Sequence, residues 1–400
     1  MKELRQERLK ICVFVNVDWF ILSHFTDYLK KVVAQNFDVT VLTLNTGRCE
    51  ETRALGATVI ELDLHRGYSN LYSEFKSWVE IYRTLRTLSP DILELITIKP
   101  VLYGGLVAKI LKINKTVFYM SGLGAVFTNQ TNFGRAKATI VTYVYKFIMS
   151  STSTAVIVEN EDDRHVFSSK IGLAGKQINL IPGVGVDMNQ FFPENRRISG
   201  NLRVALVSRL LYDKGVLEFV EAAKLCKSTR PEVEFLLVGD TDPTNPASLS
   251  QKDLEDFRRH NTVKLLGHST DVASLMKTLD ILVLPSYREG FPKVIMEAAA
   301  TGLPVVTTDV TGCRSAVVHN ETGLIVPSKN VEALEKSIGK LLDSRRLRLA
   351  MGANAREFAA LNFEELIFEI ASANRCIRKS DFNKSILDVY LTIFVTERKK

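Results

Sequence analysis

Cysteine is scarce in this 400-residue sequence, and its five cysteines show neither a Cys-x-x-Cys pair nor another metal-ligand spacing. Scattered thiols of this kind are typical of a reducing compartment, so we expect no disulfides. Long apolar runs are also missing near the start. The charged stretch 1–10 is followed by an apolar segment, 11–17, that is too short for a signal peptide or a membrane-spanning helix. We therefore expect the protein to remain in the cytoplasm.

Acidic residues are absent between Glu94 and Glu159. Basic and aromatic residues are interleaved in the same stretch: Lys99, Lys109, Lys112, Lys115, Arg135, Lys137 and Lys146, with Tyr103, Phe118, Tyr119, Phe127, Phe133, Tyr143, Tyr145 and Phe147. This mixture suits an anionic membrane surface or phosphate groups. An ordinary solvated basic face with core aromatics is the alternative. No recognised nucleic-acid-binding module accompanies the stretch, so we expect no nucleic-acid partner.

The overall composition is that of a globular protein, with 46% hydrophobic and 24% charged residues. The length favours two domains, each with its own core. A loop-rich passage runs from Pro182 to Gly200, and we place the boundary there. The predicted domains cover 1–190 and 200–365, and the segment 366–400 follows them.

Buried-strand patterns alternate with amphipathic helical patterns in both halves, which predicts an α/β fold made of two doubly wound domains. No long-period repeat relates the halves, so their likeness is architectural. The expected strands span 11–17, 38–43, 57–62, 92–96, 116–120, 155–158 and 178–181 in the first half, and 203–208, 235–239, 263–266, 281–284, 305–308 and 323–327 in the second.

One βαβ unit near residue 290 carries two carboxylates. The strand 281–284 leads into a loop with Glu289, a helix starts at Pro292, and Gly302 can take a left-handed cap before the strand 305–308. In such units the carboxyl end of the strand and the free N–H groups of the helix start face a common crevice. The sequence therefore predicts a ligand site beside Glu289 and Glu297.

Two cations are expected at the same crevice, because Arg209 and Lys214 lie together in a strand-to-helix loop of the same half. A guanidinium and an ammonium group placed together can neutralise a diphosphate. Glu297 could accept hydrogen bonds from a ribose diol, and Glu289 with the N–H groups after it could hold sugar hydroxyls. Taken singly, each carboxylate has an ordinary alternative as a solvated or salt-bridged helix residue.

The spacing of Glu289 and Glu297, with Gly-Phe-Pro after the first, resembles the donor-site motif of family-four retaining glycosyltransferases. The segment 208–215 resembles that family's diphosphate-binding Arg and Lys, and 16–24 resembles its acceptor-side loop. The segments 97–106 and 121–124 resemble the capsule and O-antigen subgroup. This resemblance covers about residues 10–365, and implies the GT-B fold: two Rossmann-like domains facing across a cleft, with a C-terminal helix, expected from 363 to 379, crossing back to the first.

Carried over by position, the resemblance implies site residues of three kinds. Expected catalytic residues are Glu289, Arg209 and Lys214. Expected donor-binding residues are these three with Gly290, Phe291, Pro292 and Glu297, and His268 as a contact to the nucleobase. Expected acceptor-side residues are Asp18, Trp19, His24, Lys99, Tyr103, Ser121 and Gly122. No metal and no cofactor are implied. Many members carry histidine where this chain has Ser121, so histidine-assisted catalysis is excluded at that position.

The resemblance implies a retaining, metal-independent transferase. It would move a hexose or N-acetylhexosamine from a UDP-sugar to a polyprenyl-diphosphate-linked saccharide in surface-polysaccharide synthesis, at the inner face of the cytoplasmic membrane. The alternatives are a non-hydrolysing sugar-nucleotide epimerase of the same fold and a non-catalytic protein that binds nucleotide sugars or membranes. Asp240-Thr241-Asp242 leaves a metal-chelating role open. The apolar residues 386–395 predict either an interfacial anchor or a packed final helix.

Overall fold

A computed structural model describes residues 8–64, 70–113, 115–122, 132–151, 154–194, 200–243 and 245–364. The described residues form two compact units that divide between Val184 and Gly185, called here the N-terminal and the C-terminal unit. The predicted crossing helix beyond residue 364, the tail 366–400 and the end of the 121–124 segment lie outside the described residues.

The N-terminal unit holds a parallel sheet of seven strands in the order β3-β2-β1-β4-β5-β6-β7. The strands are β1 (Lys10–Val17), β2 (Asp38–Leu44), β3 (Thr58–Glu61), β4 (Ile92–Ile96), β5 (Thr116–Met120), β6 (Thr154–Val158) and β7 (Ile178–Leu180). The helices between them are α1 (Asp18–His24), α2 (Thr26–Ala34), α3 (Cys49–Ala54), α4 (Leu71–Leu88), α5 (Ile98–Leu111), α6 (Asn132–Ile148) and α7 (Glu161–His165). The strand order reverses between β1 and β4, which makes this pair the switch point of the sheet.

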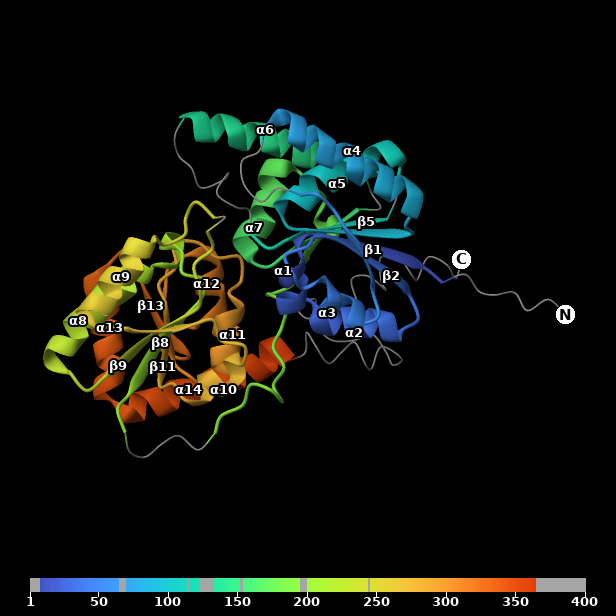
Figure 1. Ribbon diagram of the computed structural model, residues 1–400. Helices are drawn as coiled ribbons and strands as arrows, with labels where there is room; N and C mark the ends of the chain where they lie inside the picture. The colour runs from blue at the N-terminus through green and yellow to red at the C-terminus, as the bar shows by residue number, and fades with distance from the viewer. Residues whose placement is uncertain are drawn as a thin grey trace. The chain divides into compact units, whose positions relative to one another are not determined.

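Two helix layers cover the N-terminal sheet. Helices α4, α5 and α6 lie on one face, and α1, α2 and α3 lie on the other (Figure 1). The core under α4, α5 and α6 contains Phe14, Leu95 and Phe118, which are almost fully buried. Strands covered on both faces need apolar side chains at successive positions. This requirement accounts for the continuous apolar runs of β1, β4 and β5.

The C-terminal unit holds a parallel sheet of six strands in the order β10-β9-β8-β11-β12-β13. The strands are β8 (Arg203–Val207), β9 (Glu234–Val238), β10 (Lys264–Gly267), β11 (Ile281–Leu284), β12 (Val305–Thr308) and β13 (Gly323–Val326). The helices are α8 (Val216–Thr229), α9 (Gln251–His260), α10 (Val272–Lys277), α11 (Lys293–Ala300), α12 (Thr311–Ala316), α13 (Val331–Asp343) and α14 (Arg345–Ala359). Its switch point lies between β8 and β11.

The C-terminal sheet is also covered on both faces, by α8, α9 and α13 on one side and by α10, α11 and α14 on the other (Figure 1). Phe219 of α8 and Phe235 of β9 meet edge to face in the core, with ring centroids 5.9 Å apart. The doubly wound α/β architecture predicted from the sequence is confirmed in both units.

Several elements differ from the sequence predictions. Residues 18–25, predicted as a loop with a first helical turn, are helical from Asp18 onward. The short helices α2, α3, α9 and α12 are not predicted by the pattern. They carry few apolar residues or span only two turns, so their periodicity is weak.

Candidate functional site

The loops that follow β8 and β11 leave the same edge of the C-terminal sheet. These two strands are neighbours and parallel, with Ile281 in register with Val204 and Leu282 with Ala205. Because parallel strands end at one edge, the loop carrying Arg209 and Lys214 and the loop carrying Glu289 come together at the switch point. This is the position at which open α/β sheets bind ligands.

Lys214 and Glu289 form a two-pronged ion pair across the two loops. The Lys214 ammonium lies 2.6 Å from Oε1 and 2.8 Å from Oε2 of Glu289. Their side chains are only 20% and 10% exposed. The hydroxyl of the fully buried Ser286 donates a third hydrogen bond to Glu289 Oε1 at 2.6 Å. The Glu289 carboxylate is therefore held from both sides, and the predicted approach of the two loops is confirmed.

Two glycines allow the loops to approach this closely. Gly215 has φ of +70°, and a Cβ there would lie 2.1 Å from the carbonyl oxygen of Pro285. A Cβ on Gly312 at the start of α12 would lie 2.2 Å from the carbonyl oxygen of Gly290. Contacts that short are sterically excluded, so both positions require glycine in this arrangement. The Glu289 loop is thus fixed from both sides by neighbouring backbone.

A buried thiol lies near Glu289. Cys313 of α12 is fully buried, and burial, followed by the negative charge of Glu289, raises the pKa of its thiol to about 12. The thiol stays protonated at neutral pH and is no nucleophile. Cys313, Ser286 and Gly312 are not identifiable from the sequence, because only the fold brings them to Glu289.

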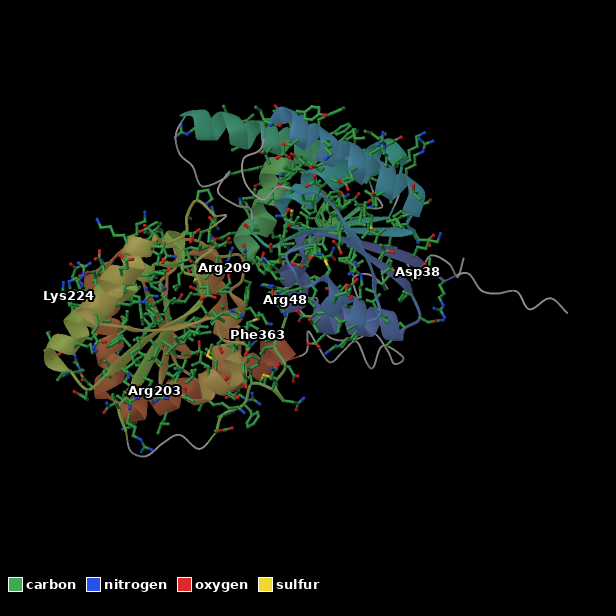
Figure 2. The ribbon with its side chains drawn as sticks, in the orientation of Figure 1. Asp38, Arg48, Arg203, Arg209, Lys224 and Phe363 are labelled. Carbon is green, nitrogen blue, oxygen red and sulfur yellow. The ribbon has the colours of Figure 1, made fainter. Side chains whose placement is uncertain are left out.

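Arg209 lies on the same loop as Lys214 but pairs differently. Its guanidinium is 3.1 Å from Asp242, and its side chain is 43% exposed (Figure 2). Asp242 belongs to the Asp-x-Asp sequence that left a metal-chelating role open, and here it serves an arginine. In the described part of the chain no group of three or more His, Cys, Asp or Glu side chains is placed to hold a metal ion. His268 lies exposed directly after β10.

Glu297 lies within α11 and is only 9% exposed. Burial raises the pKa of its carboxyl, while the charge of Lys293, 3.5 Å away, acts in the opposite direction. The side chains of Phe291 and Pro292 are buried. Phe291 packs edge to face against Phe363, with ring centroids 5.7 Å apart (Figure 2). Near these two residues, the backbone rather than the side chains is left for a ligand.

Asp18, predicted on the acceptor side, has its carboxylate occupied by the fold. It is fully buried and accepts hydrogen bonds from the N–H groups of Trp19, Thr46 and Arg48 at 2.7, 2.8 and 2.8 Å, and from the Thr46 hydroxyl. Burial alone would raise the pKa of this carboxyl, but these hydrogen bonds hold it below its usual value. Asp18 therefore ties the loop after β2 to the start of α1.

Lys99 and Tyr103 are both engaged by Glu74 of α4. The Lys99 ammonium is 2.8 Å from Glu74 Oε1, and the Tyr103 hydroxyl donates to Oε2 at 2.5 Å. Burial and the contact with Glu74 raise the pKa of Tyr103. The basic stretch without acidic residues thus receives a carboxylate from another part of the sequence. Only the packing of α4 against α5 reveals this partner.

The remaining acceptor-side candidates lie at ends of neighbouring strands. Trp19 is half-buried and meets Phe20 edge to face, and the His24 ring stacks on Phe20 with centroids 4.2 Å apart. His24 Nδ1 lies 2.6 Å from the Ser23 hydroxyl. Ser121 and Gly122 follow β5 directly, and Gly122 has φ of +103°. The structure places these residues on the carboxyl side of the N-terminal sheet.

Two Rossmann-like units, one of which carries two cations and two glutamates on the elements around its switch point, define a glycosyltransferase of the GT-B type. Family profiles match each unit separately. Residues 10–160 match the family described as glycosyl transferase 4-like, and residues 187–358 match glycosyl transferases group 1.

Curated relatives cover most of the chain. An N,N'-diacetylbacillosaminyl-diphospho-undecaprenol α-1,3-N-acetylgalactosaminyltransferase of Campylobacter jejuni is 30% identical over 86% of this chain and 93% of its own length. A UDP-Gal:α-D-GlcNAc-diphosphoundecaprenol α-1,3-galactosyltransferase of Escherichia coli is 26% identical over 72% and 75%. The capsular polysaccharide glycosyltransferase CapM of Staphylococcus aureus is 27% identical over 74% and 79%. The chain belongs to the family-four glycosyltransferases.

Solved structures show the same fold. Sucrose-phosphate synthase of Thermosynechococcus elongatus superposes with a TM-score of 0.72 at 21% identity, covering 92% of this chain and 98% of that one. HepE of Anabaena in complex with UDP superposes with a TM-score of 0.71 at 18% identity, covering 91% and 98%. The GT-B prediction is confirmed at the level of fold.

Proposed function

We propose that this glycosyltransferase moves a hexose or N-acetylhexosamine from a UDP-sugar to a polyprenyl-diphosphate-linked saccharide, with retention of anomeric configuration and without a metal ion. The observation that carries the proposal is the Lys214–Glu289 pair at the switch point of the C-terminal unit. Two relatives named for undecaprenyl-diphosphate-linked acceptors and α-1,3 linkages support the acceptor and the anomeric outcome. One of these names also specifies a UDP-sugar donor.

The donor-free site already holds the two charges that the donor needs. A UDP-sugar brings a diphosphate that can replace Glu289 as the partner of Lys214, with Arg209 moving from Asp242 to the same phosphates. Glu289 is then free to accept hydrogen bonds from sugar hydroxyls while Ser286 keeps its orientation. Glu297 accepts from the ribose diol. Each residue thus exchanges an internal partner for a donor group of the same charge type.

The reaction proposed at this site is a front-face displacement. An acceptor hydroxyl oxygen forms a bond to the anomeric carbon while the bond from that carbon to the UDP phosphate oxygen breaks. The acceptor proton passes to the leaving phosphate oxygen, so no protein base is needed. Lys214 and Arg209 stabilise the negative charge that develops on the departing diphosphate.

We place the enzyme at the inner face of the cytoplasmic membrane, because a polyprenyl-diphosphate acceptor is anchored in a bilayer. Within the described ranges, no helix combines the length and hydropathy that crossing a membrane requires. Trp19, His24, Ser121 and Gly122 are proposed as acceptor contacts. Asp18, Lys99 and Tyr103 are proposed to shape the acceptor side through the contacts they already make.

A donor screen tests the proposal. Purified protein is incubated with UDP-N-acetylgalactosamine, UDP-galactose or UDP-N-acetylglucosamine and a synthetic polyprenyl-diphosphate-linked saccharide, with and without EDTA, and the product anomer is assigned by NMR. We expect an α-linked product and no effect of EDTA. A β-linked product would overturn retention. Epimerised donor without acceptor would favour the epimerase alternative, and UDP binding without turnover would favour a binding protein.

A further inference from the structure

Helix α6 of the N-terminal unit is apolar on two opposite faces. Its inner face contributes Tyr145 and Ile148, 1% and 3% exposed, to the core beneath. Its outer face carries Ile140, Tyr143 and Phe147, which are 63%, 69% and 59% exposed. Spacings of three and four residues place these three side chains on one side of a helix. We call them the outer stripe.

The polar residues around the outer stripe share one sign of charge. Helices α5 and α6 contain no Asp or Glu. Their exposed charged residues include Lys112, Arg135 and Lys146. Lys109 of α5 places its ammonium 5.9 Å from the centre of the Phe147 ring and 2.8 Å from the Ser150 hydroxyl. An amphipathic surface of aromatic and aliphatic residues ringed by Lys and Arg is the signature of binding to a membrane interface.

A scattered set of exposed apolar residues or a dimer interface fits this surface less well. Single exposed apolar residues are ordinary on soluble proteins, but here three follow one another along a single helix face. A second copy of the chain could cover the stripe by self-association. That arrangement would bring two surfaces of the same positive sign together, which is unfavourable. An anionic surface satisfies the apolar and the charged groups at once.

We propose that the outer stripe docks this enzyme on an anionic lipid bilayer, with α6 lying along the membrane surface. Tyr143, Phe147 and Ile140 enter the headgroup and upper acyl region, while the surrounding Lys and Arg side chains contact lipid phosphates. This inference rests on the proposed function for its purpose, since a lipid-anchored acceptor must be met at a membrane. The surface itself does not depend on which sugar is transferred.

Binding should have an apolar and an electrostatic part that can be separated. Removing the three apolar side chains takes away buried area whatever the lipid charge, and should weaken partitioning by roughly 100-fold. Neutralising Lys112, Arg135 and Lys146 should weaken binding to anionic vesicles alone, by roughly 100-fold. Raising the ionic strength shortens the screening length and should reproduce the second effect without a mutation.

Vesicle flotation tests these expectations with the full chain. The vesicles contain either phosphatidylcholine alone or phosphatidylcholine with about 30% phosphatidylglycerol, chosen so that the surface potential is substantial. The variants are Ile140→Ser/Tyr143→Ser/Phe147→Ser and Lys112→Gln/Arg135→Gln/Lys146→Gln. A control, Leu217→Ser/Leu225→Ser/Leu349→Ser, removes three apolar side chains of the C-terminal unit that are 38%, 46% and 42% exposed. Thermal unfolding verifies that each variant is folded.

Wild type and the leucine control should bind anionic vesicles, and both α6-region variants should lose that binding. Transfer to a water-soluble, short-chain acceptor should be equal in wild type and the serine variant, whereas transfer to a long-chain acceptor in vesicles should fall. Vesicle binding unaffected by the outer-stripe serines would overturn the proposal. So would a concentration-dependent dimer that disappears in the serine variant. Stripe-dependent binding by a protein without transfer activity would uphold the docking surface and reject the proposed function.

Discussion

Carboxylates at the carboxyl edges of the two sheets are saturated to different degrees. Asp18 in the N-terminal unit is fully buried and accepts from three backbone N–H groups and a hydroxyl. Glu289 in the C-terminal unit is 10% exposed and shares its charge with a lysine side chain and Ser286. Backbone donors cannot leave without unfolding a loop, but a lysine can turn to another anion. The C-terminal pair is therefore suited to exchange with a ligand, and the Asp18 cluster is suited to hold a loop.

Replacing Lys214 by alanine should have the largest effect on catalysis. The leaving diphosphate loses a cation within a shielded site, so kcat/KM for transfer should fall by about 1,000-fold. The matched control is Lys224→Ala on α8, whose side chain is 65% exposed, 4.0 Å from Glu221 and well apart from Arg209 in Figure 2. Equal activity of Lys214→Ala and Lys224→Ala would show that Lys214 is merely structural.

Gly312→Ala should disturb the same pair without touching a charge. The added Cβ would lie 2.2 Å from the carbonyl oxygen of Gly290, so the Glu289 loop must shift. We expect kcat to fall by roughly 10- to 100-fold, because a displacement of about 1 Å at reacting groups has such effects. Gly339→Ala in α13 is the control, since no contact of its Cβ would be shorter than 3.5 Å. Steady-state kinetics that do not separate these two variants would contradict the role given to the loop.

Asp18→Asn tests the other side of the comparison. The folded protein should keep its kcat but lose about 1–3 kcal/mol of unfolding free energy, because hydrogen bonds to a buried charge are weakened. The pKa of Asp18 is lowered in the folded state, so its stabilisation is present above the unfolded pKa and is lost as the pH falls through the folded pKa. Urea unfolding at pH 7 and at lower pH should show this loss in wild type and not in the variant.

Asp27→Asn is the control for Asp18, because Asp27 is 54% exposed and pairs with Lys30 at 3.5 Å. Its replacement should change stability by less than about 0.5 kcal/mol. If Asp18→Asn abolished transfer while leaving the unfolding free energy unchanged, Asp18 would belong to the acceptor site and the contrast between the two units would fail.

The smallest effect is expected at Glu297. Burial raises the pKa of its carboxyl, and a protonated carboxyl accepts hydrogen bonds from a ribose diol less well. The KM for the UDP-sugar should therefore rise as the pH falls, at a higher pH than for an ordinary glutamate. Glu297→Gln should raise KM by roughly tenfold or less and flatten this dependence. A pH profile of KM shared by wild type and Glu297→Gln would remove Glu297 from the donor site.

Sequence patterns predict the buried strands better than the peripheral helices. Strands such as 92–96, 116–120, 281–284 and 305–308 have the predicted bounds, because a continuous apolar run between turn residues is typical of a strand buried on both faces. Helix α3 escapes prediction because a six-residue amphipathic helix has too little periodicity to recognise. The start of α1 at Asp18 depends on tertiary hydrogen bonds from Thr46 and Arg48.

The approach of Lys214 to Glu289 could be predicted because both lie on loops after strands that the doubly wound order makes neighbours. The contacts of Ser286 and Cys313 with Glu289 could not be, because a serine before a loop and a lone cysteine have many ordinary roles. Glu74 shows the opposite failure. It lies 25 residues before Lys99 in the sequence and neutralises a cation whose own stretch of sequence holds no acidic residue.

The most direct test of the proposed donor site measures UDP binding by calorimetry together with sugar transfer, in wild type and in Glu289→Gln. UDP should bind the variant at least as tightly as wild type, because Lys214 loses its internal competitor for the diphosphate. Sugar transfer by the same variant should fall by at least about 100-fold, because the sugar loses the carboxylate that orients it. Transfer at the wild-type rate by folded Glu289→Gln would contradict the proposed donor site, as would a variant that loses UDP binding and transfer together.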